Sequence, residues 1–456
     1  MSWTQQGTCW RRPLNCDELM FKSMASAGRH HAREQSVLCG TVRIAFTPET
    51  THVEQRLRSA WATLRLRYPD VAVVLVDNEK VYRPITSPDD LETWVASTFH
   101  VETAVKSADE LFSRHVTLPA ESASCHWVSA SSELAIVSSH WRWDGRGHMM
   151  ILHEFLSLLT VPGLDTTTHY PESEAAQLVP SLDAVLNLPH SSLPEWLTRA
   201  DALMAPLMER HPSIGLLATI GSPPGDTLRI ETVIPCEATS ALRAGCRARG
   251  IRLTAALHTS LILTTAQYHQ RDIGYSTKYK SWAAFDLRKY CPAPFHGPLH
   301  GPSIRMIGWP LVVDATDDWD SLAKKIQSVY EQSFAPEDSD LMFVRAPYME
   351  QMTRMLMAMM TAATEATPAT EPVLSNLGVL DDYVQAQYGD VAVQNVWLGV
   401  HMLIPQLGVY TWSWQGCLHI SISYNESFYQ AAFVQEWLER VKVNLFTNLE
   451  VAYSPN

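Results

Sequence analysis

Ser139-His140-Trp141-Arg142-Trp143-Asp144-Gly145 is the stretch on which the interpretation of this chain depends. It follows the apolar run Leu134-Ala135-Ile136-Val137 and precedes an apolar segment over residues 149–159. This order predicts a strand that ends near His140, a turn at Asp144-Gly145 and a buried helix beyond the turn.

The residues of this stretch suit proton transfer. A neutral imidazole accepts a proton from a hydroxyl or amine near neutral pH when its ring is held in place. We expect Asp144 to hold the loop through an arginine, and Gly145 to supply a positive φ. The candidate arginine partners are Arg142, Arg146 and Arg288. The alternative is a satisfied core histidine before an ordinary Asp-Gly turn; the short stretch alone favours it, whereas its context favours the catalytic interpretation.

Composition limits the classes of protein that this chain can belong to. A length of 456 residues predicts two domains, and 46% hydrophobic with 18% charged residues is typical of a globular protein. A net charge of −13 argues against nucleic acid as the main partner, because phosphate backbones require a basic surface. It leaves room for a phosphorylated small molecule held by a local basic patch.

The cysteines and the N-terminus indicate a compartment. Eight cysteines occur without a Cys-x-x-Cys pair, which predicts a reduced protein with buried thiols. No signal-like apolar core and no run of membrane-spanning length is found, so we expect a soluble, cytoplasmic monomer.

Two kinds of site are disfavoured by spacing. The histidines that occur in pairs or near one another lack cysteine or carboxylate partners at zinc-site spacing, so we predict no metal. These histidines are His30, His31, His148, His153, His296 and His300. No Gly-x-Ser-x-Gly elbow of a serine hydrolase is present either.

Periodicity and proline content divide the chain. Residues 1–185 are predicted to form an α+β domain that carries the histidine motif, and proline-rich residues 186–225 a crossover linker with one helix. Residues 226–456 repeat the mixed pattern, with a Met-rich helix from about residue 349 and an exposed loop over 361–372. An extended segment is expected over 275–285.

A hairpin is predicted near the end of the chain. Tyr410, Trp412 and Trp414 alternate with polar residues, Gln415-Gly416 marks a turn, and Leu418 to Tyr424 alternate again. We expect one aromatic and one polar face. Trp412 and Trp414, together with Trp143, are candidates for lining a substrate tunnel, although alternating aromatics are more often plain core.

The chain resembles the chloramphenicol-acetyltransferase-like superfamily, which includes the BAHD and condensation-domain enzymes. In appearance it is similar to fungal secondary-metabolite O-acyltransferases such as trichothecene 15-O-acetyltransferase. The residues that carry the resemblance, in chain order, are Arg67-Tyr68-Pro69-Asp70, His140 to Gly145, Gly250 to Thr254, Phe285 to Arg288, Pro372 to Gly378 and Tyr424-Asn425. It departs from condensation domains at Ser139, where they carry a second histidine, and it lacks the Asp-Phe-Gly-Trp-Gly string of plant enzymes.

The resemblance implies a fold of two similar α/β domains, in α+β layers, with a tunnel between them. It implies that His140 is the general base and that Asp144 is structural. Ser375 or Asn376 would donate to the oxyanion, although a Ser-Asn turn explains these residues nearly as well. Lys278, Lys280 and Arg288 would meet the coenzyme A (CoA) phosphates, and solvated charges explain them equally well.

The function implied is transfer of an acyl group, expected to be acetyl, from acyl-CoA to a hydroxyl of a terpenoid or polyketide. CoA serves as a co-substrate, and no cofactor stays bound. Three alternatives remain: a carrier-protein donor, a His140-catalysed cyclisation or dehydration, and binding of a hydrophobic metabolite without catalysis.

Overall fold

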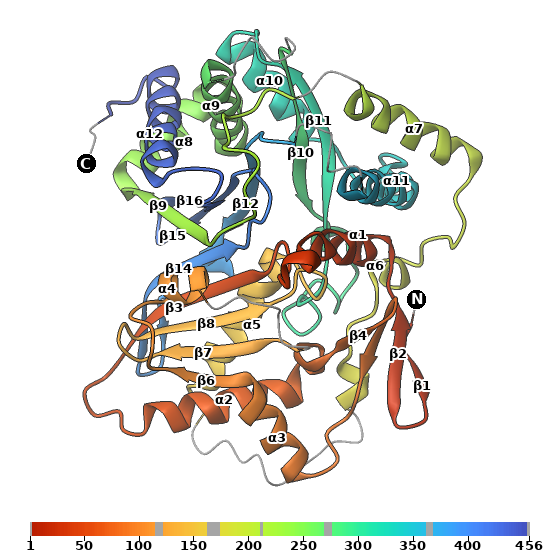
Figure 1. The fold of residues 1–456 in the computed structure, drawn as a ribbon, viewed down its shortest axis with the longest axis vertical. Helices are drawn as coiled ribbons and strands as arrows, with labels where there is room; N and C mark the ends of the chain where they lie inside the picture. Colours follow the sequence, from red (N-terminus) through yellow and green to blue (C-terminus); the bar gives the residue numbers. More distant parts are fainter. Residues whose placement is uncertain are drawn as a thin grey trace. The chain divides into compact units, whose positions relative to one another are not determined.

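The computed structural model describes residues 2–114, 122–161, 174–209, 213–268, 276–361 and 368–453. The chain forms two compact units, which are considered separately (Figure 1). Unit 1 comprises residues 1–191, 286–306 and 380–401, and unit 2 comprises residues 192–285, 307–379 and 402–456.

Unit 1 is built on a six-stranded sheet with the order β13-β14-β3-β8-β7-β6 (Figure 1). Its strands are β3 (Leu38–Phe46), β6 (Phe99–Glu102), β7 (Ser124–Val128), β8 (Glu133–Ser138), β13 (Gln387–Tyr388) and β14 (Val391–Val400). β3 lies between β8 and β14 and is antiparallel to both. Every residue of β8 is buried, as expected for a strand inside the core.

Helices and a smaller sheet complete unit 1. The helices are α1 (Cys16–Ala25), α2 (Val53–Arg67), α3 (Pro88–Thr98), α4 (Ala108–Arg114), α5 (Gly145–Leu158) and α6 (Leu182–Val185). The strands β1 (Thr4–Gln6), β2 (Cys9–Pro13), β4 (Val74–Val76) and β5 (Glu79–Tyr82) form the second sheet. α2 buries Leu57, Trp61 and Leu64, which share one face of the helix, and it ends before Pro69.

Unit 2 contains a four-stranded sheet with the order β12-β15-β16-β9. Its strands are β9 (Thr227–Ile234), β12 (Val373–Val379), β15 (Gly408–Trp414) and β16 (Cys417–Asn425). Near this sheet lie α8 (Cys236–Ala248), α9 (Leu253–Tyr268) and α12 (Ala431–Asn448) (Figure 1). Side chains of these three helices share a hydrophobic core with β15 and β16.

The remaining elements belong wholly or mostly to unit 2. They are the paired strands β10 (Lys278–Asp286) and β11 (Met306–Asp314) and the helices α7 (Pro194–Met208), α10 (Trp319–Tyr330) and α11 (Leu341–Thr361). The predicted Met-rich helix is α11, and the predicted extended segment is β10. Residue 275 of that segment and residues 362–367 of the predicted loop lie outside the described residues.

The two units differ from two consecutive domains in how the chain is divided between them. Residues 286–306 and 380–401, predicted in the C-terminal domain, belong to unit 1. The physical reason is visible in β14, whose backbone pairs with β3 from Val391 opposite Phe46 to Val400 opposite Leu38. The predicted linker is divided as well, and α7 within it belongs to unit 2.

The terminal hairpin forms where predicted, but its faces differ from the prediction. The two-residue turn places Trp414 opposite Cys417 and Trp412 opposite His419. Residues directly opposite each other project from the same face of a sheet. The aromatic residues of β15 therefore lie on the face opposite to the apolar residues of β16, which belong to the core of unit 2.

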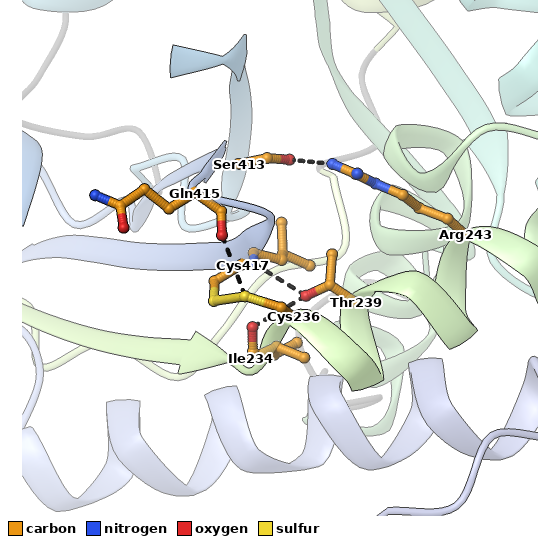
Figure 2. The surroundings of a disulfide bond; sticks show 8 residues. Ile234, Cys236, Thr239, Arg243, Ser413, Gln415 and Cys417 are labelled. Carbon is orange, nitrogen blue, oxygen red and sulfur yellow. Dashed lines mark hydrogen bonds between the residues drawn. A yellow bond between two sulfur atoms is a disulfide. The ribbon is translucent and has the colours of Figure 1, made fainter. Parts of the chain in front are cut away.

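One pair of cysteines corrects the prediction of reduced thiols. A disulfide joins Cys236, the first residue of α8, to Cys417, the first residue of β16 (Figure 2). Because β9 pairs with β16 up to Ile234 opposite Leu418, the start of α8 lies beside the start of β16, with a Cα–Cα distance of 4.2 Å. Cys39, Cys125, Cys246 and Cys291 are buried thiols that are not part of this disulfide.

Candidate active site

The motif occupies the connection between β8 and α5 in unit 1, as the sequence predicts. β8 ends at Ser138, two residues before His140. The amide of Arg142 donates to the carbonyl of Ser139 at 3.1 Å, which closes a turn. Asp144 is the N-cap of α5, so the histidine lies on a short connection held by a strand at one end and a helix at the other.

Asp144 is a saturated structural anchor. Its Oδ1 accepts from the Gly147 amide at 2.8 Å and from Arg288 Nη2 at 2.8 Å. Its Oδ2 accepts from Arg288 Nη1 at 3.0 Å and from the Arg305 amide at 2.8 Å. Burial by itself raises the pKa of this carboxyl, but the charge of Arg288 and these donors bring the pKa below its ordinary value.

Arg288 is the arginine partner of Asp144, one of the three candidates that the sequence offers for this role. Its side chain is 4% exposed, and it also pairs with Asp286 at 2.9 Å. Its Nη2 donates further to the carbonyls of Gly301 and Ser303. Arg146 pairs with the other oxygen of Asp286 at 2.6 Å. The guanidinium of Arg288 is thus enclosed by its own acceptors rather than presented to a phosphate.

The glycine of the motif has a different role from the one predicted. Gly145 is the first residue of α5 and is not among the positive-φ glycines of the described chain. The crowded position is Gly147, which the sequence analysis did not single out. A Cβ there would lie 3.1 Å from Trp143 Cβ and 3.2 Å from Arg288 Nη2. Gly147 therefore lets the first turn of α5 approach the Asp144–Arg288 pair closely.

His140 is held by packing, in contrast to Asp144. Its ring is partly buried and stacks on Phe21 of α1, with ring centroids 3.9 Å apart and planes 9° from parallel. Its Nδ1 is buried and makes no well-formed hydrogen bond with the described residues. Burial lowers the pKa of His140 to about 4, against smaller opposing effects of its own backbone, Asp144 and the backbone of Trp143. The imidazole is therefore neutral at pH 7.

A buried polar network that was not predicted from the sequence supports the same turn. Ser139 Oγ donates to Glu34 Oε2 at 3.1 Å. Arg142 Nη1 donates to Ser138 Oγ at 2.9 Å, and Nη2 donates to the Val73 carbonyl at 2.8 Å. Burial raises the pKa of Glu34 to about 7. Glu34 is distant from the motif in sequence, which is why spacing did not reveal it.

The three tryptophans predicted to line a tunnel are buried. Trp143 and Trp412 are 0% exposed and Trp414 is 5% exposed. Trp143 Nε1 donates to His148 at 3.0 Å within unit 1, and Trp412 stacks on His419 within unit 2. Their burial supports the plain-core alternative.

The two oxyanion candidates lie on β12 in unit 2 and differ in availability. Asn376 Nδ2 donates to Thr254 Oγ1 at 2.6 Å, and its Oδ1 accepts from the Gly378 amide at 2.8 Å. The side chain of Asn376 is therefore engaged at a β-bulge in the β12–β15 pair. Ser375 is half-buried, and its hydroxyl makes no hydrogen bond to the described residues. Ser375 is the freer donor of the two.

The two lysines of the predicted basic cluster both contact Glu209. Lys278 pairs with the Glu209 carboxylate at 3.1 Å. Lys280 is buried, and its Nζ donates to the Glu209 carbonyl at 3.0 Å. The Glu209 carboxylate therefore compensates the charge of Lys278, whereas the acceptor of Lys280 is a neutral carbonyl.

Metal and membrane features were also sought in the described part of the chain. There, no three His, Cys, Asp or Glu side chains gather as metal ligands. Among the helices described, none is both long enough and apolar enough to cross a membrane.

Comparisons with known proteins agree with the predicted fold class. No protein-family model matches the chain. Acetyltransferase pigO of Monascus ruber is 27% identical over 97% of this chain and 96% of its own length. O-acetyltransferase pigM of Monascus ruber is 26% identical over 88% of this chain and 77% of its own length.

A solved structure matches across the whole chain. The TRI3 trichothecene 15-O-acetyltransferase from Fusarium sporotrichioides superposes with a TM-score of 0.82 at 15% identity, covering 98% of this chain and 97% of that one. The predicted fold is confirmed, and these relatives support the predicted acyltransferase class.

Proposed function

We propose that this protein is an O-acyltransferase of fungal secondary metabolism that moves an acyl group, expected to be acetyl, from acyl-CoA to a hydroxyl of a small molecule. Relatives with acetyltransferase names match it over most of its length, which supports acyl transfer. The CoA donor and a terpenoid or polyketide acceptor are parts of the proposal.

The observation that carries the proposal is the contrast between His140 and Asp144. Asp144 is bound by Arg288 and by two backbone amides, so its role is to fix the turn. His140 keeps a neutral ring that is part exposed, with a pKa of about 4. A neutral imidazole on a fixed turn is the arrangement that a general base requires.

The reaction follows from these roles. His140 accepts the proton of the acceptor hydroxyl as the oxygen attacks the thioester carbonyl. The tetrahedral intermediate places a negative charge on the former carbonyl oxygen, and we assign Ser375 as a donor to it. When the C–S bond breaks, the CoA thiolate takes the proton from the imidazolium, so no covalent acyl-enzyme is formed.

The test is turnover of acetyl-CoA with a panel of terpenoid and polyketide alcohols, followed by thiol release and product mass. Loss of a general base lowers rates by about 10²–10⁴-fold, which is the expected effect of His140→Ala on kcat. His126→Ala is the matched control, since His126 is a partly buried histidine of the same sheet that pairs with Glu102. Undiminished turnover by folded His140→Ala would remove the base from this reaction.

The same assay addresses the alternatives. Turnover only with an acyl group on a carrier protein would replace CoA as the donor. Consumption of a substrate without any acyl donor would indicate cyclisation or dehydration.

A further inference from the structure

Three cationic side chains surround a small cavity in unit 1. The cavity has a volume of about 160 Å³, and Lys22, Arg29 and Arg33 contribute to its wall. The other lining residues are Ala25, Ser26, Glu34, Leu75 and Trp141. Half of the lining residues come from the end of α1 and the 3-10 helix η1 (Ser26–His31), so we call it the η1 cavity.

The η1 cavity shares its walls with the turn that carries His140. Phe21, which stacks on His140, directly precedes Lys22 in α1. Trp141 of the wall directly follows His140, and Glu34 of the wall accepts from Ser139. A molecule bound in this cavity therefore lies against Trp141, which follows His140, and against Glu34, which accepts from the residue before His140.

The charge at the η1 cavity opposes that of the whole protein. The chain carries a net charge of −13, yet the cavity wall has three cations and one carboxyl group. Lys22 donates to the carbonyl of Asp77 and to Asn78 Oδ1, neither of which is a charged acceptor. Burial and then the nearby charge of Arg29 lower the pKa of Lys22, which shows that these cations crowd one another.

Arg29 is the member of the group most available to a ligand. Its side chain is exposed and makes no hydrogen bond or ion pair with the described residues. The only carboxyl in the wall, Glu34, has a pKa of about 7 because it is buried, so it is partly protonated near neutral pH. The local field thus stays positive, and a guanidinium that points to solvent is suited to a phosphate oxygen.

We infer that the η1 cavity binds a phosphate group of the acyl-CoA donor, with Arg29 as the main ligand. The inference rests on the proposed function, because it assigns the donor's anionic part to a surface beside the proposed base. It is an alternative to Lys278, Lys280 and Arg288, of which Lys278 and Arg288 pair with carboxylates within the protein. A recessed cavity of a few water volumes suits a phosphate better than the broad surface of an acidic protein.

The experiment measures binding of adenosine 3′,5′-bisphosphate, the phosphate-bearing part of CoA without its thiol arm, by calorimetry. Arg29→Ala is expected to weaken binding about 10-fold or more, because charge-assisted hydrogen bonds are the strong ones. Arg29→Glu is expected to weaken it further, and affinity of the native protein is expected to fall with salt. Arg58→Ala is the matched control, since Arg58 is another partly exposed arginine of unit 1 that pairs with Glu92.

A kinetic comparison separates this inference from the proposed function. The preference for acetyl-CoA over S-acetyl-N-acetylcysteamine, which has no phosphate, should shrink in Arg29→Ala by the same factor as the binding. Native turnover of acetyl-CoA with unchanged bisphosphate binding in both Arg29 variants would overturn the inference and leave the proposed function intact. Bisphosphate binding that depends on Arg29 in a protein without acetyl transfer would support the cavity and overturn the function. Binding of an acidic carrier protein alone would overturn the CoA assignment.

Discussion

The two ends of the histidine motif are built differently. At one end Asp144 is 3% exposed and accepts four hydrogen bonds, two of them from Arg288. At the other end His140 has an aromatic neighbour, Phe21, and a buried Nδ1 without a well-formed hydrogen bond. The two side chains are four residues apart, so the difference arises from what the rest of unit 1 brings to each of them.

The two side chains are therefore expected to contribute to different properties, Asp144 to stability and His140 to catalysis. A carboxylate with four donors is fixed in charge and position, and the turn is fixed with it. A base needs a ring that is positioned but still able to accept a proton from substrate. The Asp144 end is therefore expected to determine the stability of unit 1, and the His140 end its activity.

The largest effect on stability is expected from removing the Asp144–Arg288 ion pair. Arg288→Ala leaves the buried carboxylate of Asp144 without its cationic partner, whereas the partly buried Asp286 keeps Arg146. Removing one member of a buried ion pair costs about 3–5 kcal/mol, and we expect that loss in the free energy of unfolding measured in urea. His140→Ala is the comparison, with a cost of about 1 kcal/mol or less expected because its ring is partly exposed and packs mainly on Phe21. Equal losses in the two variants would contradict the division of roles.

The placement of Asp144 was largely predictable from the sequence, whereas the identity of its partner, Arg288, was not. The apolar run, the Asp-Gly turn and the apolar segment after it indicated a strand, a turn and a helix, and Asp144 indeed caps α5. Arg288 was one of three candidate arginines, because only the return of residues 286–306 to unit 1 brings it to Asp144. Local sequence patterns do not indicate that residues 286–306 pack in unit 1.

The same limit explains the other differences. The alternation in β15 and β16 was clear, but the face of each residue depends on the register set by Gln415-Gly416. The pairing of β14 with β3, and the disulfide between Cys236 and Cys417, also join distant segments. Conversely, Lys278 and Lys280 both contact Glu209, whereas Arg288, although close to them in sequence, pairs with Asp144.

The next prediction concerns the pH dependence of stability. His140 and Asp144, at the two ends of the motif, are expected to titrate differently. The pKa of His140 is about 4 in the folded protein against an ordinary 6.5, so the unfolded chain binds the proton first on acidification. Stability from this residue is full above pH 6.5 and is lost as the pH falls to 4, by up to about 3 kcal/mol. His140→Gln should lose less stability than the native protein over that range.

Asp144 should stay ionised over the same range, because its pKa lies below the ordinary value. The measurement is urea unfolding at pH 4.5 and 7, with the His140 ring followed by NMR. His190→Gln, which changes an exposed histidine of unit 1, is the control. An NMR titration of His140 near pH 6.5 would show that the ring is not desolvated.

A smaller effect is expected at Ser139, on the His140 side of the turn. Ser139→Ala removes the hydroxyl that donates to Glu34 Oε2 and should cost about 1–2 kcal/mol. Because burial raises the pKa of Glu34 to about 7, the charged form is disfavoured, and this penalty reduces stability as the pH rises from about 4.5 through 7. The Ser139 hydroxyl helps the ionised form, so the variant should lose more stability at pH 8 than at pH 6. An equal loss at both values would mean that Glu34 is already ionised at pH 6.

The smallest effect tests the packing that holds the His140 ring. Phe21→Leu keeps an apolar side chain in α1 but removes the stacked face, which is worth about 0.5–1.5 kcal/mol beyond simple burial. We expect turnover to fall about 2-fold to 10-fold, because the ring loses the neighbour that orients it. Since burial is the main reason for the lowered pKa of His140, a smaller wall should also let that pKa rise toward 6.5. The acid limb of the rate profile and the NMR titration of His140 should then move together to higher pH. If the rate falls while the acid limb and the NMR titration of His140 stay unchanged, Phe21 contacts substrate instead. Another residue would then have to orient the His140 ring.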